Sequence, residues 1–268
     1  MSSIGLDCKV VLMTSSKAEV VEWIRTRKDA AINRVPGIMD VCHKDLFGRI
    51  MNIWSRAHPD TYDFIPKTFV CPDELSLAEA YIASRIVPGK RKPFYIVKPS
   101  VGSQGAGVIL IQDLQEIPDS TMEEEFILQE YITNPLTIDQ KKFDLRIYLT
   151  IVGVEPMVGY IGREGMVRIC TEPYEKPNRD NRDNTFIHLS NYSINKESDD
   201  FNKDLIGGSK RTLSSLFTEL GEEHAQMLST AIDEVVSKSI HALHPFVSNL
   251  CESYMAGSLD KTLGAQLF

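Results

Sequence analysis

The chain has 268 residues, 43% of them hydrophobic, and a formal net charge of −8. This length allows a core of one or two domains, and the acidic balance argues against nucleic acid as the main partner. Five scattered cysteines predict reduced thiols rather than a disulfide framework. We expect no signal peptide and no bilayer-spanning segment, and therefore a cytoplasmic protein with no membrane partner.

The first third of the chain predicts helices and extended segments joined by turns. In chain order we expect a strand over 8–12, a helix over 19–27, a turn at Pro36-Gly37, a helix over 40–57, extended chain over 64–69 and a helix over 75–85. In the 40–57 helix one face is apolar: it carries Val41, Leu46, Ile50, Ile53 and Trp54.

A glycine-rich segment then joins two β-rich apolar runs, 95–97 and 108–111, with Lys98 at the end of the first. Glycines in such a loop can turn backbone N–H groups toward an anion, and Lys98 would add positive charge. The segment is not a Walker A motif, because no Gly-Lys-Ser/Thr follows, and no helix opens as in a dinucleotide fingerprint. A plain β-hairpin with a glycine connection explains these residues equally well.

The middle of the chain predicts a mainly antiparallel α+β unit. We expect strands over 126–132, 143–154 and 157–161, a mobile loop over 172–185, and a helix over 225–243 that ends at His244-Pro245. Strand alternation places Lys142, Asp144 and Arg146 on one sheet face. Three ionic groups there are costly unless paired or used, so a functional cluster competes with a structural ion-pair ladder.

Basic residues gather at 25–28, 90–92 and 141–142. Each cluster is explained by a solvated surface; the alternative is a local basic track for an acidic polypeptide.

Several motifs occur in one consistent order from about residue 30 onward. They are 32–37, 44–46, 64–69, 97–100, 104–108, Gln129-Glu-Tyr-Ile132, Lys142-Phe-Asp-Leu-Arg-Ile-Tyr148, 163–165, His188-Leu-Ser-Asn-Tyr-Ser-Ile-Asn-Lys196 and 207–214. This series resembles the tubulin tyrosine ligase-like family, and the segment 207–214 is most similar to its polyglutamylase branch.

The resemblance implies an ATP-grasp-like α+β fold, with mainly antiparallel sheets and flanking helices. It implies an ATP- and Mg²⁺-dependent ligase that activates a glutamate carboxylate of a tubulin tail as an acyl phosphate, which the amine of free L-glutamate then displaces. The implied partners are tubulin and microtubules, and the implied location is the cytoskeleton, with cilium, flagellum or basal body as finer expectations. We expect a monomer.

The resemblance also assigns residues. ATP is expected to contact Lys44, Lys98, Gln104, Gly105, Gly107, Gln129, Glu130, Tyr131, Ile132, Lys142, Phe143, Asp144, Ser190 and Asn191, with 129–132 lining the adenine pocket. The incoming glutamate is expected at Arg168, Tyr192, Ser193 and Lys210. Arg146 and Arg163 would stabilise the acyl phosphate or the acceptor carboxylate.

Two features depart from the family pattern. Ala106 stands where the glycine loop usually carries a cation. The strands that carry the family's Mg²⁺ ligands are expected beyond Phe268, so no metal ligand is predicted here and the last strands of the fold would be absent. We expect an N-terminal part at 1–92, a central ATP-grasp sheet region at 93–212 and an incomplete C-terminal part at 213–268. Two alternatives stay open: a non-catalytic nucleotide- or tubulin-binding relative, and a ligase such as a glycylase for another acceptor.

Overall fold

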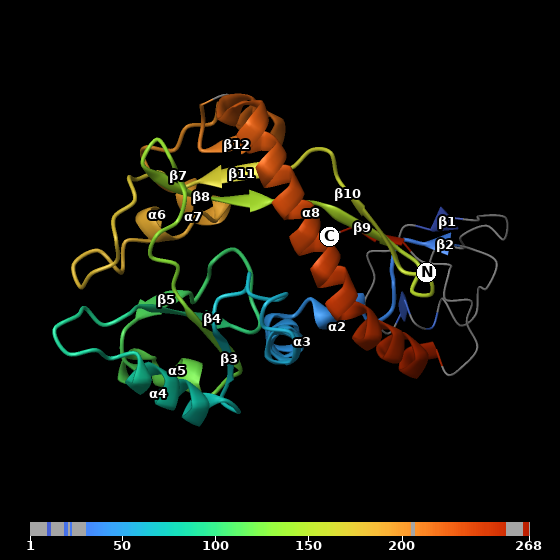
Figure 1. Ribbon diagram of the computed structural model, residues 1–268, viewed down its shortest axis with the longest axis horizontal. Coiled ribbons are helices and arrows are strands. Elements are labelled where there is room, and N and C mark those ends of the chain that lie inside the picture. The colour runs from blue at the N-terminus through green and yellow to red at the C-terminus, as the bar shows by residue number, and fades with distance from the viewer. Residues whose placement is uncertain are drawn as a thin grey trace. The chain divides into compact units, whose positions relative to one another are not determined.

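The computed structural model describes residues 10–11, 19–20, 22, 31–204, 207–255 and 265–267 (Figure 1). These residues fall into two compact units. Unit 1 is drawn from residues 1–42, 147–163 and 232–268, and unit 2 from residues 43–146 and 164–231. Both units are discontinuous in sequence, whereas the sequence analysis expected three consecutive segments. The helix expected over 19–27 lies largely outside the described residues, as do most residues of the strand expected over 8–12.

Unit 2 contains a four-stranded antiparallel sheet in the order β3-β6-β4-β5. Its strands are β3 (Thr68–Cys71), β6 (Phe126–Glu130), β4 (Tyr95–Pro99) and β5 (Ile109–Ile111). The predicted hairpin of β4 and β5 is confirmed. The helices of this part are α3 (Lys44–Ala57), η1 (Leu114–Glu116), α5 (Asp119–Met122) and α4 (Leu75–Ser84), the last close to the predicted 75–85.

Strand alternation gives the two faces of this sheet different roles. Tyr95 and Val97 pack with Ala78 and Ile82 of α4 in one fully buried core. Phe94 and Ile96 belong to a separate apolar cluster on the other face. Because Lys98 follows in the same alternation, its ammonium group emerges on the second face rather than in the α4 core.

A second antiparallel sheet of unit 2 has the order β12-β11-β8-β7. Its strands are β12 (Lys210–Thr212), β11 (Met166–Ile169), β8 (Lys141–Arg146) and β7 (Thr137–Ile138), and two single-turn helices, α6 (Thr185–His188) and α7 (Tyr192–Asn195), follow β11 in the chain. The segment between β11 and α6 contains no helix or strand, as predicted for 172–185.

Unit 1 contains an antiparallel sheet of β10 (Val158–Ile161), β9 (Leu149–Val152) and β13 (Ala265–Leu267), in that order. It also contains a parallel pair, β1 (Val10–Val11) and β2 (Ala31–Ile32), and the short helix α2 (Ile38–Val41). The prediction of one strand over 143–154 was wrong, because the chain leaves the β8 pairing after Arg146 and resumes as β9 in another sheet. The pairing of 157–161 with β9 is confirmed.

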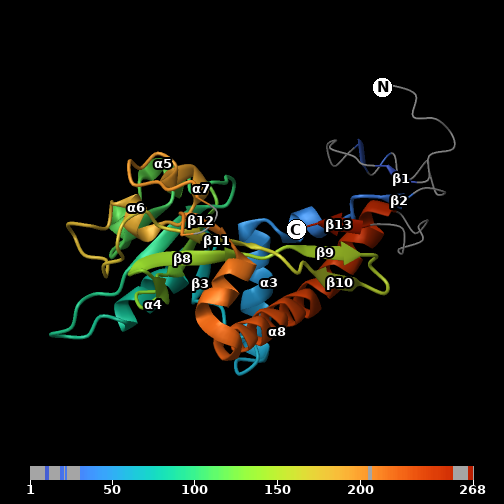
Figure 2. The ribbon, with the colours of Figure 1, turned by 90° about the horizontal axis from the view of Figure 1, so that it is seen from above.

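Two helix predictions also need correction. The helix expected over 40–57 is interrupted at 42–43 between α2 and α3, and Ile53, placed on its apolar face, is 52% exposed. The helix expected to stop at His244-Pro245 belongs to α8 (Leu213–Met255), which Gly221 (φ 77°, ψ 165°) divides and which continues through Pro245. Proline removes one helical hydrogen bond but need not end a helix that packing holds. His244 Nε2 donates to the Val154 carbonyl at 3.0 Å, and the second part of α8 lies along β9 and β10 (Figure 2).

Within the ranges that the structure describes, no helix is both long enough and apolar enough to cross a membrane.

Candidate active site

The glycine loop between β4 and β5 is held in a conformation that only glycine adopts readily. Gly102, Gly105 and Gly107 all have positive φ, and so does Gln104 at 67°. The Gln104 carbonyl accepts a hydrogen bond of 2.7 Å from Ser193 Oγ, so the loop is fastened to α7. A Cβ atom at Gly105 would lie 2.6 Å from Ile194 Cδ1 and 3.2 Å from Asn191 Oδ1. The loop therefore lies directly against the segment that begins α7.

We expect Gly105→Ala to weaken anion binding at this loop about tenfold, because the added Cβ would lie 2.6 Å from Ile194 Cδ1 and 3.2 Å from Asn191 Oδ1, and a side chain at φ +87° adds about 1 kcal/mol of strain. Gly89→Ala is the matched control: Gly89 has nearly the same φ, +79°, and no atom within 4 Å of the added Cβ. Titration calorimetry with ATP would measure both variants. Equal affinities for the two variants would contradict the role given to the loop contact.

Three lysines from three elements line one cavity of about 380 Å³. Lys44, the first residue of α3, donates to the carbonyls of Gly102 at 2.8 Å and Ser100 at 3.3 Å. Lys98 of β4 donates to Gln129 Oε1 at 2.8 Å. Lys142 of β8 donates to the His188 carbonyl at 2.9 Å and to Tyr131 Oη at 3.0 Å. All the acceptors in these hydrogen bonds are neutral, so none of them cancels the charge of the lysine it holds.

The surroundings of Lys98 and Lys142 disfavour the charged forms of both side chains, and a bound anion would offset this. Burial, and then the nearby Lys44, lower the pKa of Lys98. Burial is also the main cause that lowers the pKa of Lys142 to about 8, with a further contribution from Lys98 against an opposing one from Asp144. A bound polyanion would relieve both the lost hydration and the repulsion between like charges.

Lys142 is fixed by a directional hydrogen-bond network. His188 Nε2 lies 3.1 Å from the Asn181 carbonyl, which can only accept, so this nitrogen carries the proton. Nδ1 then accepts from Tyr131 Oη at 3.1 Å, and the same oxygen accepts from Lys142. Burial lowers the pKa of His188 to about 4, so the imidazole is neutral at pH 7.

Gln129 holds Lys98 through a second directional chain. Its Oε1 accepts from Lys98, its Nε2 donates to Thr68 Oγ1 at 2.7 Å, and that hydroxyl donates to the Pro66 carbonyl at 2.7 Å. The amide is thereby fixed with its oxygen toward the lysine. Gln129 was expected to line the adenine pocket; in the structure its side chain holds the Lys98 ammonium group.

Asp144, which also lines the cavity, is engaged on both oxygens. It forms a two-point ion pair with Arg168, with Nε–Oδ1 2.7 Å and Nη2–Oδ2 2.8 Å, and accepts from Ser190 Oγ at 2.5 Å. The sequence left open whether the ionic residues of β8 form a structural ion-pair ladder or a functional cluster. One structural ion pair is present, and it joins two strands, because Asp144 of β8 and Arg168 of β11 are register partners.

The structure brings together most, but not all, of the predicted residues. The predicted residues that line the Lys98 cavity are Lys44, Lys98, Gln104, Gly105, Lys142, Asp144, Ser190 and Asn191. Gly107 and Ser193 are parts of the loop and its fastening to α7. Lys210 Nζ lies 5.4 Å from the ring centroid of Tyr192.

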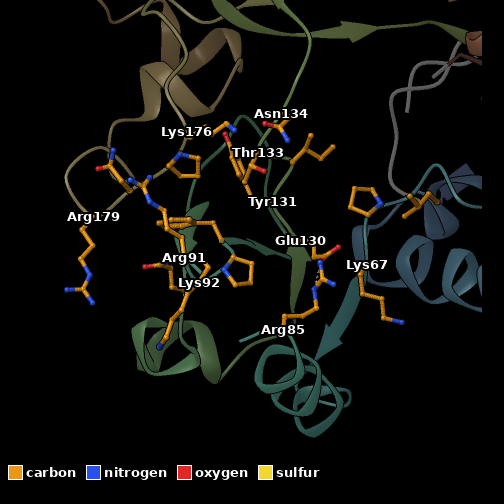
Figure 3. A pocket seen from close by; sticks show the side chains of 18 of the residues that line it. Lys67, Arg85, Arg91, Lys92, Glu130, Tyr131, Thr133, Asn134, Lys176 and Arg179 are labelled. Carbon is orange, nitrogen blue, oxygen red and sulfur yellow. Dashed lines mark hydrogen bonds and ion pairs between the residues drawn. The ribbon is translucent and has the colours of Figure 1, made fainter. Parts of the chain in front are cut away.

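Six further predicted residues do not line the Lys98 cavity. Glu130 accepts from Tyr81 Oη at 2.7 Å and lies 3.5 Å from Arg85 Nε, so its side chain faces α4; Glu130, Tyr131 and Ile132 line a second pocket (Figure 3). Phe143 alternates away from Lys142 and Asp144 on β8. Arg146 is exposed at the end of β8, and Arg163 belongs to unit 1.

Sequence reasoning assigned no role to His188 or Asn195, although both lie in the motif 188–196. Asn195 is 1% exposed, accepts from Thr171 N at 2.9 Å and donates to the Leu189 carbonyl at 2.7 Å. Each is a polar residue next to apolar residues that predict burial, and this pattern could have identified both.

These residues fit the phosphates of a nucleotide, because three lysines and a glycine loop with left-handed backbone converge on one cavity. The described residues contain no group of three or more His, Cys, Asp or Glu side chains that could hold a metal ion.

The comparisons with known proteins agree with this geometry. Human tubulin polyglutamylase TTLL6 is 36% identical over 219 residues, which cover 81% of this chain and 24% of that protein. Human tubulin polyglutamylase TTLL11 is 35% identical, over 80% of this chain and 31% of that protein, and zebrafish tubulin polyglutamylase ttll6 is 35% identical, over 91% and 29%. The chain thus spans about a quarter to a third of the length of these relatives.

Among solved structures, the C-terminal domain of K. lactis Pby1, an ATP-grasp enzyme that interacts with the mRNA decapping enzyme Dcp2, superposes with a TM-score of 0.61. The alignment covers 99% of this chain and 71% of that domain at 15% identity, which shows the ATP-grasp fold. The sequence profile of the tubulin-tyrosine ligase family matches residues 23–257, and the chain belongs to this family.

Proposed function

We propose that the chain carries the nucleotide site of an ATP-dependent carboxylate–amine ligase that adds glutamate to glutamate side chains in tubulin tails. The observation that carries this proposal is the convergence of Lys44, Lys98 and Lys142 on the cavity beside the glycine loop. The names of the relatives support glutamate and tubulin as substrates. We further propose that the protein acts as a monomer at cytoplasmic microtubules.

In this proposal the three lysines hold the phosphates of ATP. Phosphoryl transfer depends mainly on positioning and on stabilising the charge that spreads over the phosphate oxygens. Lys98 and Lys142 are preorganised for this task, since the neutral acceptors Gln129, Tyr131 and the His188 carbonyl fix them without cancelling their charge. The glycine loop adds backbone N–H groups, and Ser190 and Asn191 add side-chain polar groups.

The proposed reaction has two steps. A carboxylate oxygen of the acceptor attacks the terminal phosphorus of ATP, and the bond to ADP breaks. The amine of free glutamate then attacks the carbonyl carbon, the C–O bond to phosphate breaks, and the amine gives up a proton. Because the described residues lack a cluster of acidic metal ligands, no step here is assigned to Mg²⁺.

Tyr192, Ser193, Lys210 and Arg168 are proposed to hold the incoming glutamate. Arg168 already binds Asp144 through Nε and Nη2. A guanidinium has five N–H donors, so Arg168 keeps donors for a ligand carboxylate while Asp144 fixes its plane.

The test is incorporation of labelled glutamate into tubulin by the 268-residue chain with MgATP. We expect Lys98→Met to lower incorporation about 100-fold, the effect of removing one preorganised charge donor. Lys203→Met, at an exposed lysine outside the cavity, should leave incorporation unchanged.

Two outcomes would replace the proposal. Binding of ATP without any incorporation would identify a non-catalytic relative, an outcome that the absence of an acidic cluster among the described residues makes worth testing. Preference for labelled glycine over glutamate would identify a glycine ligase.

A further inference from the structure

A second pocket, of about 1040 Å³, lies in unit 2 and shares no lining residue with the Lys98 cavity. It is formed mainly by the segments 63–67, 91–94, 130–134 and 176–179. Four apolar residues, Phe64, Pro93, Phe94 and Pro177, are among its lining residues. It also includes Glu130, Tyr131 and Ile132, which the resemblance assigned to the adenine pocket, whereas the three lysines proposed to hold the phosphates line the other cavity.

Positive charge dominates the lining. Six cationic side chains, Lys67, Arg85, Arg91, Lys92, Lys176 and Arg179, face two acidic ones, Asp63 and Glu130. This local excess occurs in a chain whose net charge is −8, so it is not a general property of the surface. It includes Arg91 and Lys92 of the 90–92 cluster, for which the sequence left a basic track for an acidic polypeptide as one interpretation.

The cations differ in how far they are already neutralised. Lys92 donates to both Asp113 oxygens at 2.8 Å, and Arg85 lies 3.5 Å from Glu130. Arg91, Lys176 and Arg179 form no ion pair within the part of the chain that the structure describes, and neither does Lys67, whose Nζ lies 5.4 Å from the ring centroid of Phe69. In Figure 3 the first three lie on one side of the pocket together with Lys92, whereas Arg85, Glu130 and Lys67 lie on the other. Three of the four cations without an ion pair therefore share one wall.

The form of the pocket favours an extended anion over a small one. Each of the three unpaired cations on that wall is exposed, and a single exposed ion pair contributes little, so several charges must act together. The volume lies at the upper end of the usual range of small-molecule pockets, about 300–1,000 Å³, so it has room for several residues of an extended chain. Nucleic acid fits less well, because stacking needs exposed aromatic faces, whereas Phe94 and Tyr131 are only 6% and 8% exposed.

We propose that this pocket binds an acidic segment of polypeptide. Successive carboxylates of the segment lie opposite Arg91, Lys176 and Arg179, and its apolar parts contact the lining prolines and phenylalanines. The identity of the polypeptide rests on the ligase function proposed above. With that function, the bound segment is a part of the acceptor polypeptide that does not contain the reacting residue.

The test uses fluorescein-labelled hexaglutamate and fluorescence anisotropy with the 268-residue chain. We expect hexaglutamate to bind and hexaglutamine not to bind. Lys176→Gln/Arg179→Gln should weaken hexaglutamate binding about fivefold or more, because each exposed ion pair is worth up to about 1 kcal/mol. Lys203→Glu changes the net charge by the same amount, −2, at an exposed site outside the pocket, and should not weaken binding.

Three results would overturn the proposal. Equal weakening by Lys203→Glu would show that the net charge of the chain, and not this pocket, determines hexaglutamate binding. Displacement of hexaglutamate by ATP would make the pocket part of the nucleotide site. Tighter binding of hexauridylate than of hexaglutamate would make it a nucleic-acid site. Lys98→Met separates this proposal from the proposed function, because it should weaken ATP binding and leave hexaglutamate binding unchanged.

Discussion

The affinity for ATP should fall as the pH rises above about 8, because Lys142 loses its proton there in the free protein. Below that pH the ammonium group is charged and can donate to a phosphate oxygen. A charge-assisted hydrogen bond of this kind contributes about 1.5–3 kcal/mol, which corresponds to about 10- to 100-fold in affinity. Bound phosphate raises the pKa of Lys142 in turn, so the loss should approach tenfold per pH unit until the pKa of the complex is reached.

Titration calorimetry across this pH range would measure the effect. Lys142→Met should bind ATP about 10- to 100-fold more weakly at pH 7 and should show no inflection near pH 8. Identical pH profiles for the wild type and Lys142→Met would rule out Lys142 as the titrating group.

Stability should change with pH in the opposite direction. The pKa of Lys142 is lower in the folded chain than its usual value of 10.5, so between about pH 8 and 10.5 the unfolded chain holds more protons and the free energy of unfolding rises with pH. The gain should be absent from Lys142→Met. Urea denaturation of both proteins at pH 7 and 10 would isolate this contribution from other titrating groups.

Replacing Asn195 with alanine should lower the free energy of unfolding by about 2–4 kcal/mol. The buried amide makes four hydrogen bonds, two from Thr171 to its oxygen and two from its nitrogen to the carbonyls of Leu189 and Asn191. The Asn191 carbonyl also accepts from backbone N–H groups, so Thr171 N and the Leu189 carbonyl would lose most. Leu189 and Asn191 line the Lys98 cavity, so ATP affinity should fall as well.

Asn134→Ala is the matched control, since Asn134 is exposed and its side chain forms no hydrogen bond with the residues that the structure describes. It should unfold within about 0.5 kcal/mol of the wild type. A loss of less than 1 kcal/mol for Asn195→Ala would mean that water or rearranged backbone replaces the amide. Asn195→Asp should be at least as destabilising as alanine, because it would set a carboxylate against two carbonyl oxygens.

The local pattern around Lys98 was sufficient to predict the hairpin, and the two clusters packed on β4 then show the face on which the lysine emerges. Period-two alternation fixes side-chain direction in a strand regardless of what the sheet packs against. The resemblance added the convergence of Lys44 and Lys142, which are far apart in the sequence. Neither source predicted that Glu130 faces α4, because its partners Tyr81 and Arg85 come from a helix whose position depends on tertiary packing.

The failures at strand and helix ends have a similar origin. From Phe143 to Val154 apolar residues recur with no proline and no glycine before Gly153, and only the change of pairing partner after Arg146 divides the segment into two strands. Pro245 signals a helix end locally, but contacts such as that of His244 with the Val154 carbonyl hold the helix beyond it. Sequence patterns near such points describe local preference, and long-range contacts then decide between continuation and interruption.

The choice of an amide at position 129 has a consequence for what Lys98 can offer a ligand. A carboxylate there would hold the ammonium group equally well, but it would form an ion pair and remove the positive potential from the mouth of the cavity. The oriented amide instead supplies a partial negative charge that is sufficient to fix the side chain and too weak to compete with a phosphate. Gln129→Glu should therefore preserve the architecture while lowering the positive charge that the cavity offers to an anion.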